Sequence, residues 1–162
     1  MVPTAVKRVF LLAGIFLLGI SIAFAAGAKP VKISPKERCP VCGMFVAKYP
    51  DFAAQIQLVD GSTVHFDGAK DMFKYHLDLP RYAPGKKNSD IGAIFVTDYY
   101  TLTPVDGRSA YYVTGSDVLG PMGRELIPFA KQSEARDFMT DHKGKSLFRF
   151  QEVTRSVIGA LD

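Results

Sequence analysis

Two stretches of eight residues decide the fold, and they are AKDMFKYH (residues 69–76) and ARDFMTDH (residues 135–142). The second begins 66 positions after the first, and six of the eight positions carry identical or similar side chains. In each copy an alanine, two large apolar residues and a histidine occupy positions i, i+3, i+4 and i+7, which form one face of an amphipathic helix. The repeat therefore predicts two related helices that arose by duplication.

Polar residues mark the ends of both predicted helices. Asp67 and Ser133 occupy the positions of N-terminal capping residues. His76 and His142 recur at the same repeat position near the C-terminal ends, where a histidine interacts favourably with the helix dipole. We therefore interpret these two histidines as structural residues first.

Strands are predicted on both sides of each helix, because short segments alternate apolar and polar residues. Asp60-Gly61 supplies the turn of a hairpin between the first two segments. Both halves follow the order ββαβ, so the predicted fold class is α+β, with duplicated ββαβ units packed together because neither unit buries enough surface alone. The segments are 54–58, 63–66 and 93–97 in the first half, and 110–114, 125–129 and 147–150 in the second.

The N-terminus has the pattern of an export signal. Lys7 and Arg8 precede an apolar run over residues 9–26, and Ala23-Phe24-Ala25 matches the small-x-small pattern that a signal peptidase accepts. The run is also close to the roughly 18 apolar residues that span a bilayer, so an uncleaved anchor is the alternative. No cysteine lies at the end of the run, which excludes lipid attachment there. We expect a periplasmic or other extracytoplasmic protein, free or held by its N-terminal helix.

The expected organisation has five parts. Residues 1–25 form the signal peptide or anchor, residues 26–50 carry the cysteine motif, residues 51–104 and 105–155 form the two ββαβ repeats, and residues 156–162 form a tail. The formal net charge of +4 is modest for this length and gives no indication of nucleic-acid binding.

The only two cysteines of the chain lie in the motif CPVCGM at residues 39–44. Cys39, Cys42 and Met44 bring three sulfur donors into six residues. A thiolate combined with a thioether favours a soft cation such as Cu(I), whereas zinc sites more often combine cysteine with cysteine or histidine. The motif therefore predicts a Cu(I) site.

Other interpretations of the two cysteines stay open. Export exposes thiols to oxidants, so Cys39 and Cys42 could form a disulfide that is structural or redox-active. A thioredoxin-like role is less favoured, because the motif does not follow a strand at the start of a helix. Structural zinc would need two further ligands, and His65, His76 and His142 are the only histidines.

Two further residues are candidate copper ligands. Met122 lies in Gly120-Pro121-Met122-Gly123, whose turn-forming residues predict a loop that displays the thioether. His65 is expected on the exposed face of its strand, opposite Val64 and Phe66, as a supplementary ligand. Met44 has the alternative of filling a gap in the core.

No enzyme is indicated by the sequence. It contains no recognisable Ser-His-Asp signature, no glycine-rich phosphate loop and no carboxylate pair whose spacing demands acid-base chemistry. A carrier is therefore the expected class of protein.

The motifs together resemble the NosL family of nitrous oxide reductase accessory proteins. The resemblance runs in order from about Cys39 to Val153. It rests on Cys-Pro-Val-Cys-Gly-Met at 39–44, Phe-Asp-Gly at 66–68, Val-Thr-Asp-Tyr at 96–99, and the long segment at 115–129 that includes Gly-Pro-Met-Gly.

The resemblance implies a periplasmic Cu(I)-binding protein that delivers copper for the copper centres of nitrous oxide reductase, together with a membrane ABC-type complex. Met122 corresponds to the methionine of the family's Gly-Pro-Met-Gly segment. NosL proteins are commonly lipoproteins, and the chain departs from them in lacking the lipobox cysteine. The expected mechanism is ligand exchange, with Cys42 as the thiolate, Met44 and Met122 as thioethers, and Cys39 as a second thiolate or a redox partner.

Overall fold

The computed structural model describes residues 27–162. The predicted signal peptide or anchor at residues 1–25 lies outside the described residues. Among residues 27–162, no helix combines the length and the apolar character that crossing a lipid bilayer requires.

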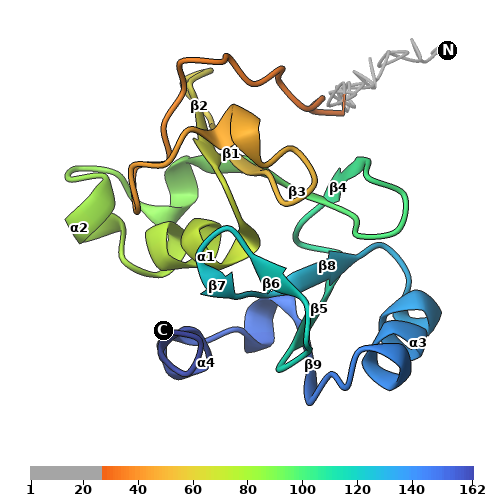
Figure 1. Cartoon of the computed structure of the whole chain (residues 1–162). Helices are drawn as coiled ribbons and strands as arrows, with labels where there is room; N and C mark the ends of the chain where they lie inside the picture. The colour runs from red at the N-terminus through yellow and green to blue at the C-terminus, as the bar shows by residue number, and fades with distance from the viewer. Residues whose placement is uncertain (1–26) are drawn as a thin grey trace, which may run out of the picture.

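The first repeat forms a four-stranded antiparallel sheet with one main helix. Its order is β2-β1-β3-β4, and the strands are β1 (Ala54–Leu58), β2 (Thr63–Phe66), β3 (Ile91–Thr97) and β4 (Pro104–Asp106). Helix α1 (Ala69–Leu77) follows β2 and covers one face of the sheet (Figure 1). Ile56 and Ile94 pair across β1 and β3 and are both buried, as the alternating pattern predicts.

The second repeat has the same order of elements with an insertion. Its sheet has the order β8-β5-β9, formed by β5 (Tyr111–Thr114), β8 (Ile127–Phe129) and β9 (Ser146–Arg149), and α3 (Gln132–Asp141) lies between β8 and β9 in sequence. A small hairpin of β6 (Leu119–Gly120) and β7 (Gly123–Arg124) is inserted between β5 and β8. The predicted duplicated ββαβ fold is confirmed.

Several elements add to the two repeats. Helix α2 (Leu79–Tyr82) follows α1, helix α4 (Arg155–Gly159) follows β9, and 3-10 turns cover Val46–Lys48, Asn88–Asp90 and Phe150–Glu152. Strand β4 pairs with β3 and crosses the expected repeat boundary at 104/105. The last residues pack into the fold, since Ile158 and Leu161 belong to the main core.

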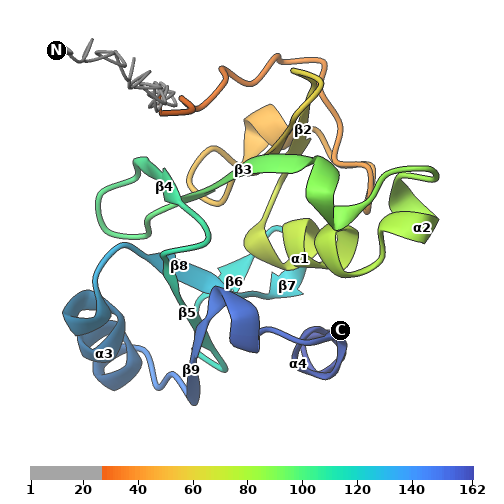
Figure 2. The same ribbon diagram turned by 180° about the vertical axis from the view of Figure 1, so that it is seen from behind.

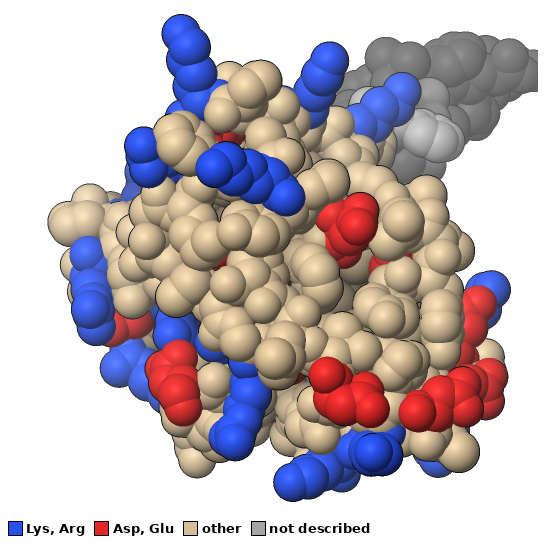
Figure 3. Space-filling view, in the orientation of Figure 1, with Lys and Arg blue, Asp and Glu red and all other residues tan. Residues whose placement is uncertain are grey.

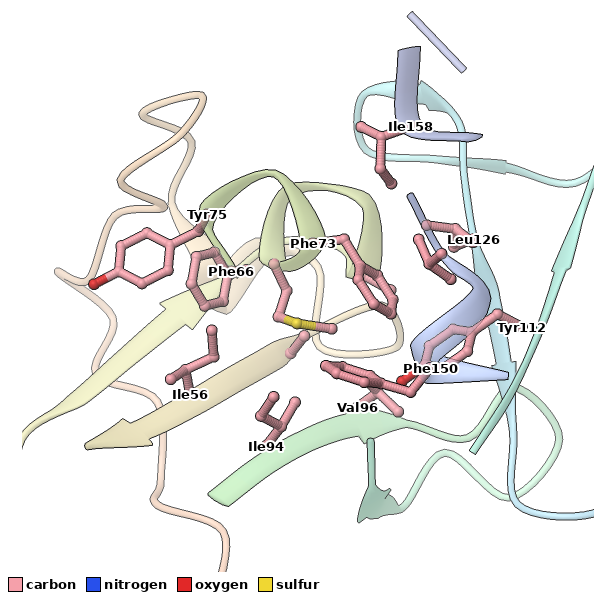
Figure 4. Close-up of a cluster of buried hydrophobic side chains, with 14 of the residues drawn as sticks. Ile56, Phe66, Phe73, Tyr75, Ile94, Val96, Tyr112, Leu126, Phe150 and Ile158 are labelled. Atoms are coloured by element: carbon pink, nitrogen blue, oxygen red, sulfur yellow. The ribbon is translucent and has the colours of Figure 1, made fainter. Parts of the chain in front are cut away.

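The two repeats share the main hydrophobic core. Phe73 of α1 packs edge-on against Tyr112 of β5 and also contacts Phe150, with ring centroids 5.0 Å apart in both pairs (Figure 4). The next residue of β5, Val113, points to the opposite face and joins a smaller cluster beneath α3. The second sheet is therefore buried on both sides, and one side completes the core of the first repeat (Figures 1 and 2).

The predicted helix caps are wrong. The N-cap of α1 is Gly68 and that of α3 is Lys131, and neither helix receives a capping hydrogen bond from the N-cap side chain. Asp67 instead lies beside Cys42, and the backbone N–H of Lys70 in the first turn of α1 donates to the carboxylate of Glu125 from the second repeat.

Candidate metal centre

The CPVCGM motif forms a tight turn that fixes both cysteines. The backbone N–H of Gly43 donates to the Cys39 carbonyl at 2.8 Å, and the N–H of Cys39 donates to the Met44 carbonyl at 2.9 Å. Gly43 has φ +79°, a left-handed conformation that other residues adopt only with strain. Arg38 donates to the Gly43 carbonyl at 2.8 Å and closes the turn from outside. The backbone of the motif is thus held in place in the absence of an ion.

Two carboxylates from the start of α1 meet the two thiols. Cys39 Sγ lies 3.3 Å from Asp71 Oδ2, and Cys42 Sγ lies 3.2 Å from Asp67 Oδ1. One donor atom from each of the four side chains can be chosen so that all lie within 4.8 Å of one another. Asp67 directly precedes the N-cap of α1 and Asp71 lies in its first turn, so both aspartates reach the same cysteine turn.

The environment keeps both thiols protonated in the ion-free protein. Burial, and after it the neighbouring carboxylates of Asp71 and Asp67, raise the pKa of Cys42 to about 12. Burial raises the pKa of Cys39 still further above the usual range of a thiol. Both cysteines are free, so the structure contains no disulfide between them.

The candidate methionines occupy different positions relative to this cluster. Met44 is the last residue of the turn and is half-buried. Met122 lies in the two-residue connection of the β6–β7 hairpin, and 46% of its surface is exposed, so the predicted loop with a displayed thioether is present. The Met122 carbonyl accepts a hydrogen bond from Lys70 at 3.0 Å, which places the hairpin against the first turn of α1.

His65 differs from its predicted position. It was expected on an exposed strand face, yet only 3% of its surface is exposed. Its Nδ1 lies 2.7 Å from Glu37 Oε1, and its Nε2 lies 3.4 Å from the Val31 carbonyl. The residues before the cysteine motif run across β1 and β2 and cover that face, which the strand pattern alone does not reveal. His65 lies outside the four-residue cluster of thiols and carboxylates.

Sequence reasoning missed the carboxylate half of the site. Asp67 was predicted as a helix cap, and Asp71 carried no predicted role. The repeat gives no signal for Asp71, because its counterpart Asp137 is the same residue type and is exposed on α3, whereas Asp71 is buried. Contact with the cysteine turn distinguishes Asp71 from Asp137.

The carboxylate of Asp67 gives a testable prediction in the ion-free protein. Asp67→Asn removes a negative charge beside Cys42, so the pKa of that thiol should fall and more thiolate should be present at a given pH. We expect Cys42 to react several-fold faster with an alkylating reagent at pH 8, measured by mass spectrometry of the peptide that carries it. Asp60→Asn, at a surface aspartate paired with Lys86, is the control and should leave the rate unchanged. An equal rate in Asp67→Asn would mean that the carboxylate does not govern the thiol.

The model of the NosL family matches residues 30–158. The chain belongs to the NosL family. The match confirms the resemblance seen in the sequence, and it extends over both repeats and the cysteine turn.

Individual NosL proteins are similar over most of this chain. The copper-binding lipoprotein NosL of Stutzerimonas stutzeri is 27% identical over 132 residues, which cover 80% of this chain and 68% of that protein. The crystal structure of the copper chaperone NosL from Shewanella denitrificans has a TM-score of 0.67 at 25% identity and covers 79% of this chain and 97% of that one. The expectation of a carrier, and not an enzyme, agrees with both of these NosL relatives.

Proposed function

We propose that this NosL protein binds one Cu(I) ion at the cysteine turn and passes it to a recipient protein by ligand exchange. The observation that carries the proposal is the pair of free thiols, held by a preformed turn within reach of each other. Two thiols and neighbouring thioethers are the donors that a soft monovalent ion prefers, whereas carboxylates prefer harder ions. The two NosL relatives, a copper-binding lipoprotein and a copper chaperone, support copper as the ion that is carried.

The proposed ligands are Cys39 and Cys42 as thiolates, with Met44 and Met122 supplying thioethers. Asp67 and Asp71 accept hydrogen bonds from the thiols in the ion-free protein. We leave His65 out of the proposed ligand set, because both of its ring nitrogens already have oxygen partners.

The proposed copper ligands differ in exposure in a way that suits ligand exchange with a recipient protein. Cys39 is buried, Cys42 is half-exposed, and Met122 is exposed at the tip of its hairpin. A recipient's ligand can therefore approach the half-exposed Cys42 while the buried Cys39 retains the ion. On the face drawn in Figure 3, the Lys, Arg, Asp and Glu side chains lie mostly towards the rim.

The destination and the location of the protein are proposed from the family resemblance. We infer delivery to nitrous oxide reductase through a membrane ABC-type complex, outside the cytoplasm. Residues 1–25 would serve as the export signal or as an uncleaved anchor. Deleting the gene in its host should lower the copper content of the recipient enzyme, and a normal content would redirect the search to another cuproprotein.

Copper binding by the purified protein tests the proposal directly. We expect the reduced protein to take one Cu(I) per chain from a chromophoric Cu(I) chelator and to prefer Cu(I) strongly to Zn(II). Because binding displaces thiol protons, the affinity should fall as the pH drops from 8 to 6, by up to about tenfold per pH unit for each proton displaced.

Two outcomes would contradict this proposal. Failure to withdraw copper from even a weak chelator, with both thiols verified as reduced, would exclude the carrier. Thiol titration of anaerobically isolated protein is the second measurement. A stable disulfide between Cys39 and Cys42 that is present with and without Cu(I) would favour a redox-active or disulfide-stapled module of the cell envelope.

A further inference from the structure

Lys70 is an unusual residue of α1, because it is a lysine buried in the protein. Only 3% of its side chain is exposed. Its ammonium Nζ donates to the Met122 carbonyl at 3.0 Å and to the Leu161 carbonyl at 3.4 Å, and it lies 3.8 Å from the Asp162 carboxylate. A buried ammonium is stable only when such acceptors compensate its lost hydration. The side chain therefore joins α1 to the hairpin and to the last residues of the chain.

The backbone of Lys70 is held by the same segment. Glu125 directly follows β7, and its Oε1 accepts from the N–H of Lys70 at 2.6 Å and from the N–H of Leu126 at 2.8 Å. This carboxylate takes the place of a side-chain cap at the start of α1, where free N–H groups and the helix dipole favour a negative charge. A Cβ at Gly68 would lie 2.2 Å from Glu125 Oε2, so the glycine makes room for the cap. Met122 therefore binds the side-chain ammonium of Lys70, and Glu125 binds its backbone N–H.

The second repeat shows that the duplicated fold does not require this arrangement. Arg136 occupies the matching position of α3 and is exposed. The basic residue is buried only in the copy of the helix whose first turn carries Asp71.

The hairpin needs such support. Its two strands pair at only two positions, Leu119 with Arg124 and Gly120 with Gly123. An isolated two-stranded hairpin is marginally stable in water. Its position against α1 must therefore come from contacts outside it, and Lys70 and Glu125 provide hydrogen bonds between the two.

We propose that Lys70 is a positioning residue that holds the β6–β7 hairpin, and with it Met122, over the cysteine turn. The inference rests on the proposed function in that Met122 is taken to be a copper ligand. Lys70 itself does not touch the ion. It acts by fixing the carbonyl of Met122 to the first turn of α1, which also carries Asp71.

A double-mutant cycle tests this role. The variants are Lys70→Met, which removes the ammonium and keeps much of the aliphatic length, Met122→Ala, and the two combined. Lys74→Met is the matched control, because Lys74 lies on the same helix and its ammonium pairs with Asp162. Cu(I) affinity is measured by chelator competition, and the number of sulfur neighbours by X-ray absorption at the copper edge.

The expected result is non-additive. Met122→Ala and Lys70→Met should each lower affinity about tenfold and remove one sulfur neighbour, and the combined variant should be no weaker than Met122→Ala. Lys74→Met should bind like the unaltered protein. In the ion-free protein, amide hydrogen exchange of residues 119–124 should be faster in Lys70→Met and unchanged in Lys74→Met.

The outcomes separate this inference from the proposed function. Unchanged affinity in Met122→Ala would remove Met122 from the ligand set. If Met122→Ala lowers Cu(I) affinity but Lys70→Met binds Cu(I) normally, the positioning role is overturned and the proposed function stands. The same holds if the losses of affinity in the two single variants add up in the combined variant. If Lys70→Met fails to fold, Lys70→Arg replaces it, and normal hairpin exchange with normal affinity in that variant would support positioning by a retained cation. Fast exchange without any loss of affinity would contradict it.

Discussion

Replacing Cys42 with serine is expected to lower Cu(I) affinity by well over tenfold, at about 1.4 kcal/mol for each factor of ten. The hydroxyl of serine does not supply an anionic soft donor at neutral pH, so the ion loses the half-exposed thiolate of the turn. Chelator competition at pH 7.5 under reducing conditions measures the loss.

Cys39→Ser provides the comparison. Cys39 has 1% of its surface exposed and belongs to the main core, so serine there should also lower the thermal stability of the ion-free protein. We expect its loss of affinity to be smaller than that of Cys42→Ser, because the more accessible thiol is the one with the less strongly raised pKa. If both variants bind copper like the unaltered protein, the ion binds elsewhere.

Phe73→Ala is expected to lower the free energy of unfolding by about 3 to 5 kcal/mol. Phe73 is fully buried and contacts Tyr112 and Phe150 from the second repeat, so its loss leaves a cavity between the repeats. This cost is a large fraction of the 5 to 15 kcal/mol typical of a folded domain. Urea unfolding followed by circular dichroism measures it, and Phe73→Leu serves if the alanine variant does not fold.

The duplication supplies the matched control for this change. Met139 occupies the corresponding position of α3 but is only half-buried, at the edge of the smaller cluster. Met139→Ala should cost about 1 kcal/mol. Equal costs for the two variants, or two separate unfolding transitions in the unaltered protein, would show that the repeats do not depend on a shared core.

The site was predictable in part. The two cysteines adjacent to a methionine indicated soft-metal chemistry from their residue types alone, and the glycine and proline around Met122 indicated a displayed loop. The partners of the thiols were not predictable in this way. Asp67 and Asp71 contact residues 25 and 32 positions earlier in the chain, and no local pattern records such contacts.

The sequence by itself determined the elements of the two repeats, because helix and strand periods follow from which neighbouring residues are apolar. It also determined the family, through motifs that keep their order along the chain. The tertiary structure alone decided which polar residues are buried. Lys70 and Arg136 share a repeat position, yet only Lys70 is covered, since the hairpin and the last residues pack over α1 and not over α3. The cap of α1 by Glu125 and the burial of His65 have the same cause. A polar side chain loses water only where a segment distant in sequence packs against it, and that segment must then supply the hydrogen bond that replaces the water.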